Sequence, residues 1–212
     1  MARQDQSNTA AILWRSISTR VMGVPNRTVL VLGANGDEGA RAVTLAAAEQ
    51  AVAEGLKVCV VSLEATTDPA SAAARTTTID VGPYGFTVEH LGAAGPDLLV
   101  LKLDGPFMRD LITHDTPDAP DHQGGLRRQL RTRLNEIYDF VLFTGGSVLQ
   151  DPYSLLFAAE VAGVFMVVRA GRTRLPVFAR ARSLIEAHQG TVIGAILTDR
   201  KYYIPRWLYD RL

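Results

Sequence analysis

The sequence predicts a three-layer α/β sandwich in which helices cover both faces of a mostly parallel sheet. Six short apolar runs rich in β-branched residues recur along the chain, and most lack polar alternation, as strands buried on both faces do. Stretches with helical spacing separate them, and this alternation is typical of a parallel sheet with right-handed crossovers. The six runs cover residues 28–33, 57–63, 97–103, 139–145, 163–170 and 191–197.

Helices are expected before the first strand and between later ones. The opening helix is expected over residues 8–22, with an apolar side formed by Ile12, Leu13, Ile17 and Val21. Apolar residues three to four positions apart form one stripe along a helix, and this stripe would cover the sheet. Further helices are expected over residues 39–54, about 125–137, 151–161 and 173–188.

Two stretches are expected to be irregular, because small, polar and turn-forming residues dominate them. They are residues 66–85 and residues 113–125, the second of which is rich in proline and aspartate and is expected to be a mobile loop. The 212 residues contain no internal repeat and no linker, so a single domain spanning residues 1–212 is expected.

The composition excludes several classes of function. The formal net charge is zero, so no global field draws the chain toward nucleic acid or an anionic membrane. Cys59 is the single cysteine and stands in an apolar run, which predicts a buried thiol and excludes a disulfide framework. The N-terminus lacks a secretory pattern, and no apolar run reaches the roughly 18 residues of a membrane helix. We therefore expect a cytoplasmic protein.

The segment GANGDEGAR, residues 33–41, follows the first predicted strand and leads into a helix. A strand, a glycine loop and a helix N-terminus together surround an anion with backbone N–H groups. The active pattern G-x-x-x-x-G-K-[ST] adds a lysine that neutralises phosphates and a hydroxyl that holds Mg²⁺. Here Gly39 takes the second glycine position, Ala40 the lysine position and Arg41 the hydroxyl position.

These replacements predict weak nucleotide binding. A charged hydrogen bond contributes about 1.5–3 kcal/mol, and the loop adds negative charge through Asp37 and Glu38. Since 1.4 kcal/mol is a factor of ten, ATP affinity is expected to fall by several decades. We favour a loop whose glycines, Gly36 among them, only make a tight turn. Binding of ATP or ADP with Mg²⁺ stays open as an alternative, because the guanidinium of Arg41 suits phosphate.

Over nearly its whole length the chain resembles the cytoplasmic domain of bacterial protein-tyrosine kinases of capsule and exopolysaccharide systems. The resemblance rests on residues 12–22, 29–65 and 130–174, which follow the family's order. The first stretch resembles the opening helix, and the second resembles a strand, phosphate loop, helix and second strand. The third contains YDFVLF and VVRAGRT, which resemble two later strands. Those kinases are MinD/ParA-like deviant P-loop ATPases, so the resemblance implies a P-loop NTPase-like fold.

The motifs that carry activity in that family are altered here. Besides Ala40 at the lysine position, Ser62 and Glu64 stand where the family's second acidic motif has two aspartates. Thr144 stands at the aspartate position after the YDFVLF strand. In the family these carboxylates organise Mg²⁺ and the attacking hydroxyl. The resemblance therefore implies a degenerate nucleotide site with no catalytic residue and no metal.

The resemblance also bears on assembly and on the tail. Of the family's E-x-x-R-x-x-R motif, used for ring assembly, only Arg15 remains, which leaves a homo-oligomer open. Tyr202, Tyr203 and Tyr209 lie where the family has a terminal tyrosine cluster, as phosphate acceptors or as part of a docking tail. We favour docking, because the apolar residues within 204–208 have helical spacing.

Three other patterns are weaker. His114 and His122 match no zinc spacing, so no metal is expected there. The arginines of residues 126–133 are expected to form a solvated helix face rather than a nucleic-acid site. Residues 145–147, GGS, do not form a nucleophile elbow and are expected to be a loop after the strand.

Together these features predict a non-catalytic, pseudokinase-like subunit in exopolysaccharide biosynthesis or export. The resemblance implies an inner-membrane polysaccharide co-polymerase or export protein as partner, which would place the chain at the inner face of that membrane. One alternative is an active ATP-dependent tyrosine autokinase with a site rewired around Arg41 and Glu64. A second is a MinD/ParA-like positioning scaffold that lost its switch.

Overall fold

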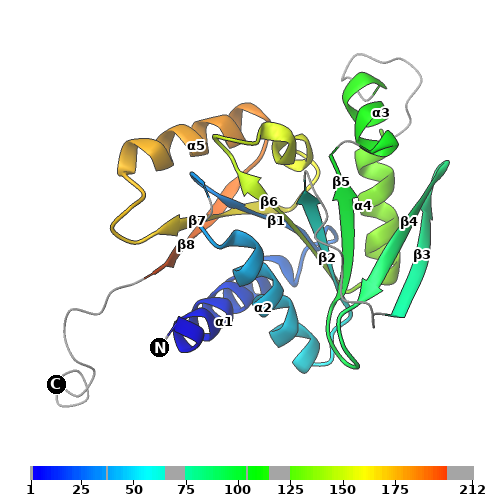
Figure 1. Ribbon diagram of the computed structural model, residues 1–212, viewed down its shortest axis with the longest axis horizontal. Helices are drawn as coiled ribbons and strands as arrows, with labels where there is room; N and C mark the ends of the chain where they lie inside the picture. Colours follow the sequence, from blue (N-terminus) through cyan, green and yellow to red (C-terminus); the bar gives the residue numbers. More distant parts are fainter. Residues whose placement is uncertain (1, 37, 65–74, 104, 115–124, 200–212) are drawn as a thin grey trace.

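The computed structural model describes residues 2–36, 38–64, 75–103, 105–114 and 125–199 (Figure 1). Its centre is an eight-stranded sheet in the order β3-β4-β5-β2-β6-β1-β7-β8. The strands β5, β2, β6, β1, β7 and β8 are parallel, whereas β4 pairs antiparallel with both β3 and β5. The bounds are β1 (Thr28–Gly33), β2 (Val58–Glu64), β3 (Arg75–Val81), β4 (Tyr84–His90), β5 (Asp97–Lys102), β6 (Phe140–Ser147), β7 (Gly163–Arg169) and β8 (Val192–Thr198).

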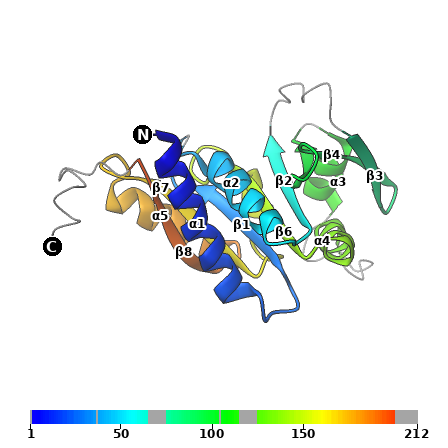
Figure 2. The same cartoon turned by 90° about the horizontal axis from the view of Figure 1, so that it is seen from below.

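Helices cover both faces of the sheet, as Figure 2 shows. On one face lie α1 (Ala2–Val21) and α2 (Ala40–Ala53). The other face carries α3 (Pro106–His114), α4 (Leu126–Ile137) and α5 (Leu175–Ala187). A separate hydrophobic cluster fills the space on each side of the sheet. The three-layer α/β sandwich with a mostly parallel sheet is therefore confirmed.

The six predicted strands are present, with ends shifted by at most two residues. These strands are recognisable in the sequence as apolar runs because most of them lie in the middle of the sheet. The edge strand β8 packs against helices. All six residues of β1 are buried. Cys59 is also fully buried, and this burial raises the pKa of its thiol.

The opening helix is longer than predicted, since α1 begins at Ala2. Leu13, Ile17 and Val21 are buried as expected, but Ile12 is 56% exposed, so its assignment to the apolar side was wrong. The three buried residues are four positions apart and form a narrow stripe, from which Ile12 is rotated by about 100°. Trp14, on the other flank, packs in its place. Among the described helices, none is long and apolar enough to cross a membrane.

The helix predicted over residues 151–161 was wrong. The structure has a short 3₁₀ helix, η1 (Pro152–Phe157), and then turns until β7 begins at Gly163. The side chain of Asp151 accepts a hydrogen bond from the Tyr153 backbone N–H at 3.2 Å. This cap starts a tight helical turn, and 3₁₀ helices rarely extend beyond a few residues.

The irregular stretch predicted over residues 66–85 was also wrong from residue 75 onward. There β3 and β4 form a hairpin in which Arg75 pairs with His90 and Val81 with Tyr84. Only Ile79 and Val81 of β3 are buried, so this strand carried too little apolar signal to be recognised. The helix α3 was not predicted; it includes residues 113–114 of the expected loop, and residues 115–124 lie outside the described part.

Candidate functional site

The loop between β1 and α2 has the backbone of a tight glycine turn. Gly36 and Gly39 have φ angles of 70° and 78°, in the left-handed region that glycine adopts without a steric penalty. Gly39 is also the N-cap of α2, where no side chain caps the helix. The left-handed conformation of these two glycines turns the chain from β1 into α2. Asp37 lies outside the described residues.

Glu38 connects this loop to residues at the ends of β7 and β8. Its side chain is buried and accepts hydrogen bonds from the Ala34 backbone N–H and the Thr173 hydroxyl. Its backbone oxygen accepts a third from the Thr198 hydroxyl at 3.1 Å. Thr173 follows β7 and Thr198 ends β8, so the carboxylate and the backbone oxygen of Glu38 together join the loop to the far part of the sheet. Apart from the VVRAGRT run that contains Thr173, no pattern in the sequence indicated these two partners.

Replacing Glu38 with alanine should destabilise the fold around this loop. Hydrogen bonds to a charged group contribute about 1.5–3 kcal/mol each, although burying the charge offsets part of this. We expect the free energy of unfolding to fall by about 1–3 kcal/mol, measured by urea denaturation. The control is Glu49→Ala, which changes an exposed glutamate of α2 and should have almost no effect. Equal stability of Glu38→Ala and Glu49→Ala would contradict this role.

The two positions that follow the loop differ sharply in environment. Ala40 is the first residue of α2 and is 6% exposed, so a methyl group packs where the sequence pattern of active loops has a lysine. Arg41 is exposed. The loop therefore has no ammonium group directed into it from position 40, and Arg41 is the nearest cation in sequence.

Ser62 and Thr144 lie side by side beneath the same helix. They pair in register between β2 and β6, and both are 1% exposed. Alternation along the strands places them on the α2 face, with Val60 and Leu142. Among the described residues, the Thr144 hydroxyl has no hydrogen-bond partner. Two neutral hydroxyls thus occupy the strand positions where the sequence resemblance implies metal-binding carboxylates.

Glu64 is the last residue of β2 and pairs in register with Lys102 of β5. Ser62, by contrast, lies next to Thr144 in the ladder. The parallel strands therefore bring the altered positions of the loop, β2 and β6 to one edge of the sheet, because β6 lies between β1 and β2. Among the described residues, no group of three or more His, Cys, Asp or Glu side chains could hold a metal ion.

The GGS segment is not a loop, which corrects the prediction for residues 145–147. These residues are the end of β6, and Ser147 pairs with Gly33. A Cβ at Gly145 would lie 2.7 Å from the Cβ of Ser154, so glycine is needed for η1 to pack against the strand. The Ser147 hydroxyl accepts from the Leu149 N–H at 3.3 Å, which is a turn contact.

The basic helix α4 is only partly a solvated face. Arg127 donates to the Leu156 carbonyl at 2.8 Å, and Arg131 lies 3.7 Å from a carboxylate oxygen of Glu160. These two arginines bind the segment that leads into β7. The sequence pattern did not predict these contacts. His114 ends α3, and His122 lies outside the described residues.

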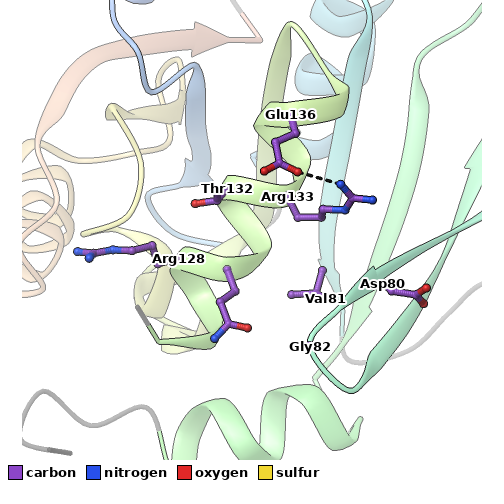
Figure 3. Close-up of a pocket in the computed structure, with 8 residues that line it drawn as sticks. Asp80, Val81, Gly82, Arg128, Thr132, Arg133 and Glu136 are labelled. Carbon is purple, nitrogen blue, oxygen red and sulfur yellow. Dashed lines mark hydrogen bonds and ion pairs between the residues drawn. The ribbon is translucent and has the colours of Figure 1, made fainter. Parts of the chain in front are cut away.

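A hollow of about 330 Å³ lies between α4 and the β3–β4 turn (Figure 3). Arg133 and Glu136 in its wall form an ion pair at 2.8 Å. The charges in the wall balance, so they select neither an anion nor a cation. The lining residues are Asp80, Val81, Gly82, Arg128, Gln129, Thr132, Arg133 and Glu136. None of them belongs to the β1–α2 loop, and we assign this hollow no function.

The tail tyrosines, Tyr202, Tyr203 and Tyr209, lie outside the described residues. The last described residue, Asp199, forms an ion pair with Arg169 at 2.8 Å. Since Thr198 also contacts Glu38, the chain leaves the sheet next to the β1–α2 loop.

No protein-family model and no curated protein matches the sequence. Among solved structures, the kinase domain of the Escherichia coli tyrosine kinase ETK matches with a TM-score of 0.71 at 16% identity, over 94% of this chain and 79% of that one. The VpsO kinase domain gives 0.68 at 17%, over 94% and 98%, and the BceF tyrosine kinase domain gives 0.65 at 17%, over 90% and 76%. The chain therefore has the fold of bacterial tyrosine kinase domains.

Proposed function

We propose that the chain is a non-catalytic, pseudokinase-like cytoplasmic subunit of exopolysaccharide biosynthesis or export. One observation carries the proposal: the tyrosine kinase fold is kept, while Ala40, Ser62 and Thr144 occupy the positions where that chemistry needs a lysine and two carboxylates. These three residues are buried among the described residues of the sheet and of α2. A fold retained without its reactive groups fits a role in binding.

ATP and Mg²⁺, which the fold implies, do not fit these residues. Mg²⁺ prefers carboxylate oxygens and water in octahedral geometry, and it is usually held by one or two carboxylates plus phosphate. Ser62 and Thr144 are neutral and buried, and the methyl group of Ala40 offers no charge to a phosphate. Phosphoryl transfer depends on positioning and charge stabilisation by these groups, so we assign the site no catalytic step.

The partner in this proposal is an inner-membrane polysaccharide co-polymerase or export protein. Support comes from the likeness to kinase domains and from apolar side chains left exposed on two elements. Ile12 on α1 is 56% exposed and Leu175 at the start of α5 is 78% exposed. We include these two side chains in the proposed contact surface. We place the contact surface on α1 and on the carboxyl edge of the sheet.

Affinity capture of the tagged chain from detergent-solubilised membranes tests this proposal, with captured proteins identified by mass spectrometry. The expected result is enrichment of a polysaccharide co-polymerase or export protein, reduced by the double substitution Ile12→Asp and Leu175→Asp. Two exposed positions are chosen so that the fold is retained. Recovery of cell-division or DNA-segregation proteins alone would contradict the proposal and favour the positioning scaffold.

The tail is proposed to dock, on the body or on the partner, rather than to accept phosphate. Ile204, Trp207 and Leu208 stand at i, i+3 and i+4, which is one side of a short helix, and Pro205 suits its first turn. Deleting residues 202–212 should therefore lower the melting temperature or abolish capture of the partner. A shortened chain with unchanged melting and unchanged capture would rule out docking. Phosphotyrosine detected in cells at Tyr202 would favour the acceptor role.

A further inference from the structure

A chain of hydrogen bonds joins four side chains at the edge of the sheet opposite the β1–α2 loop. The Thr77 hydroxyl lies 2.8 Å from Nε2 of His90, and Nδ1 of that ring contacts Oδ1 of Asp97. The Tyr138 hydroxyl donates to the other carboxylate oxygen of Asp97 at 2.8 Å. Asp97 begins β5 and pairs with Cys59 near the start of β2, which fixes this group at the amino edge of the parallel strands.

The contact with Asp97 determines which nitrogen of the neutral imidazole carries the proton. The carboxylate of Asp97 only accepts hydrogen bonds, so Nδ1 of His90 carries the proton between them. In the neutral ring Nε2 is then the acceptor, and the Thr77 hydroxyl donates to it. Burial raises the pKa of Tyr138, which therefore keeps its proton and donates to Asp97. The hydroxyl, the base and the orienting carboxylate are thus hydrogen-bonded in the order that is typical of activated nucleophiles.

The residues at the two ends of this hydrogen-bond network differ in solvent exposure. Thr77 is exposed and lies on β3, which is an edge strand of the described sheet. The side chains of His90 and Asp97 are 34% and 18% exposed, so Thr77 is the more accessible end and Asp97 the more buried one. Besides the Thr77 contact, seven residue pairs of the β3–β4 ladder hold the hairpin together. The open edge of a terminal strand also carries backbone N–H groups that no ladder in the described sheet uses, and such groups can stabilise an oxyanion.

We propose that Thr77 is a nucleophilic modification site that accepts an acyl group from an activated ester. In the step, Oγ of Thr77 attacks the carbonyl carbon as Nε2 of His90 takes the hydroxyl proton. The bond from that carbon to the leaving alkoxide or phenoxide breaks, and the leaving group takes up the proton. The products are an ester on Thr77 and a free alcohol or phenol, with no change in oxidation state. Asp97 acts as a positioning residue for the imidazole.

Acetylation by p-nitrophenyl acetate tests the proposal on the full chain, with peptide mass spectrometry reporting the initial rate at each residue. Thr77 should be acetylated at least about 100-fold faster than the exposed Thr78 on the same strand, since a general base contributes about 10²–10⁴-fold. His90→Gln should remove this advantage, with the protein still folded in a melting curve. Thr78→Ala is the matched control and should leave the rate at Thr77 unchanged.

Two outcomes would overturn the proposal. One is acetylation of Thr77 no faster than that of Thr78. The other is a rate at Thr77 that His90→Gln leaves unchanged in a folded protein. If His90→Gln fails to fold, Thr77→Ser is measured instead. A serine in the same contact should also be acetylated fast. If the network is purely structural, neither Thr77 nor the serine should react fast.

Discussion

The fourfold variant Ala40→Lys, Arg41→Thr, Ser62→Asp and Thr144→Asp should bind ATP with Mg²⁺ about 100-fold to 10,000-fold more tightly than the natural chain. It restores at least two charged contacts of about 1.5–3 kcal/mol each, and 1.4 kcal/mol is a factor of ten. The loop and the strand ends are already in place, with Ser62 and Thr144 adjacent in the ladder. Calorimetry with ATP and Mg²⁺ measures the gain.

The melting temperature of the same variant provides a second test. Two carboxylates at positions that are 1% exposed repel each other and are poorly solvated, so without Mg²⁺ the melting temperature should fall. Mg²⁺ with ADP should restore it, because a ligand that binds the folded state stabilises it. The control Ala40→Lys should release no phosphate from ATP, since the carboxylates at 62 and 144 remain absent. Phosphate release by that single variant would show that the site is less degenerate than we infer.

Trp14→Ala should cause the largest loss of stability among the single substitutions considered. Trp14 is 3% exposed and meets the ring of Phe140 edge to face, with centroids 5.2 Å apart. Truncating a buried aromatic side chain costs about 3–5 kcal/mol. For a chain of this size each kcal/mol shifts the melting temperature by about 2–4 °C, so a fall of about 6–20 °C is expected.

The matched control for Trp14→Ala is Ile12→Ala in the same helix. Ile12 is 56% exposed, so its truncation should change the free energy of unfolding by no more than about 0.5 kcal/mol. Comparable losses from both substitutions would mean that α1 does not pack through Trp14 as described. The comparison is also informative because the sequence pattern alone assigned Ile12 to the buried side.

The central part of the sheet was predictable from sequence because its strands are buried on both faces. Runs such as residues 28–33 contain no polar residue after Thr28, so they differ clearly from helices and loops. The hairpin was missed for the opposite reason, since five of the seven residues of β3, Arg75 to Thr78 and Asp80, are exposed and polar. These strands form through backbone pairing of β3 with β4 and of β4 with β5, which does not require an apolar run in β3.

The position of the candidate site in the fold was predictable from the sequence, but most of its side-chain contacts were not. Strand order places residues at the ends of β1, β2 and β6 together, which is why Ser62 and Thr144 meet beneath α2. The direction of the Glu38 side chain was not predictable, because its hydroxyl partner Thr173 is 135 residues away in sequence. Similarly, the contact of Thr77 with His90 depends on a hairpin that the sequence did not reveal.

Calorimetric titration of the natural chain with ATP and Mg²⁺ tests the central claim most directly. A non-catalytic chain with Ala40, Ser62 and Thr144 at the nucleotide site should show no binding tighter than about 100 μM, which corresponds to about −5.5 kcal/mol. Tighter binding that is lost in Arg41→Ala would contradict the account and establish a rewired kinase site that uses the exposed arginine of α2.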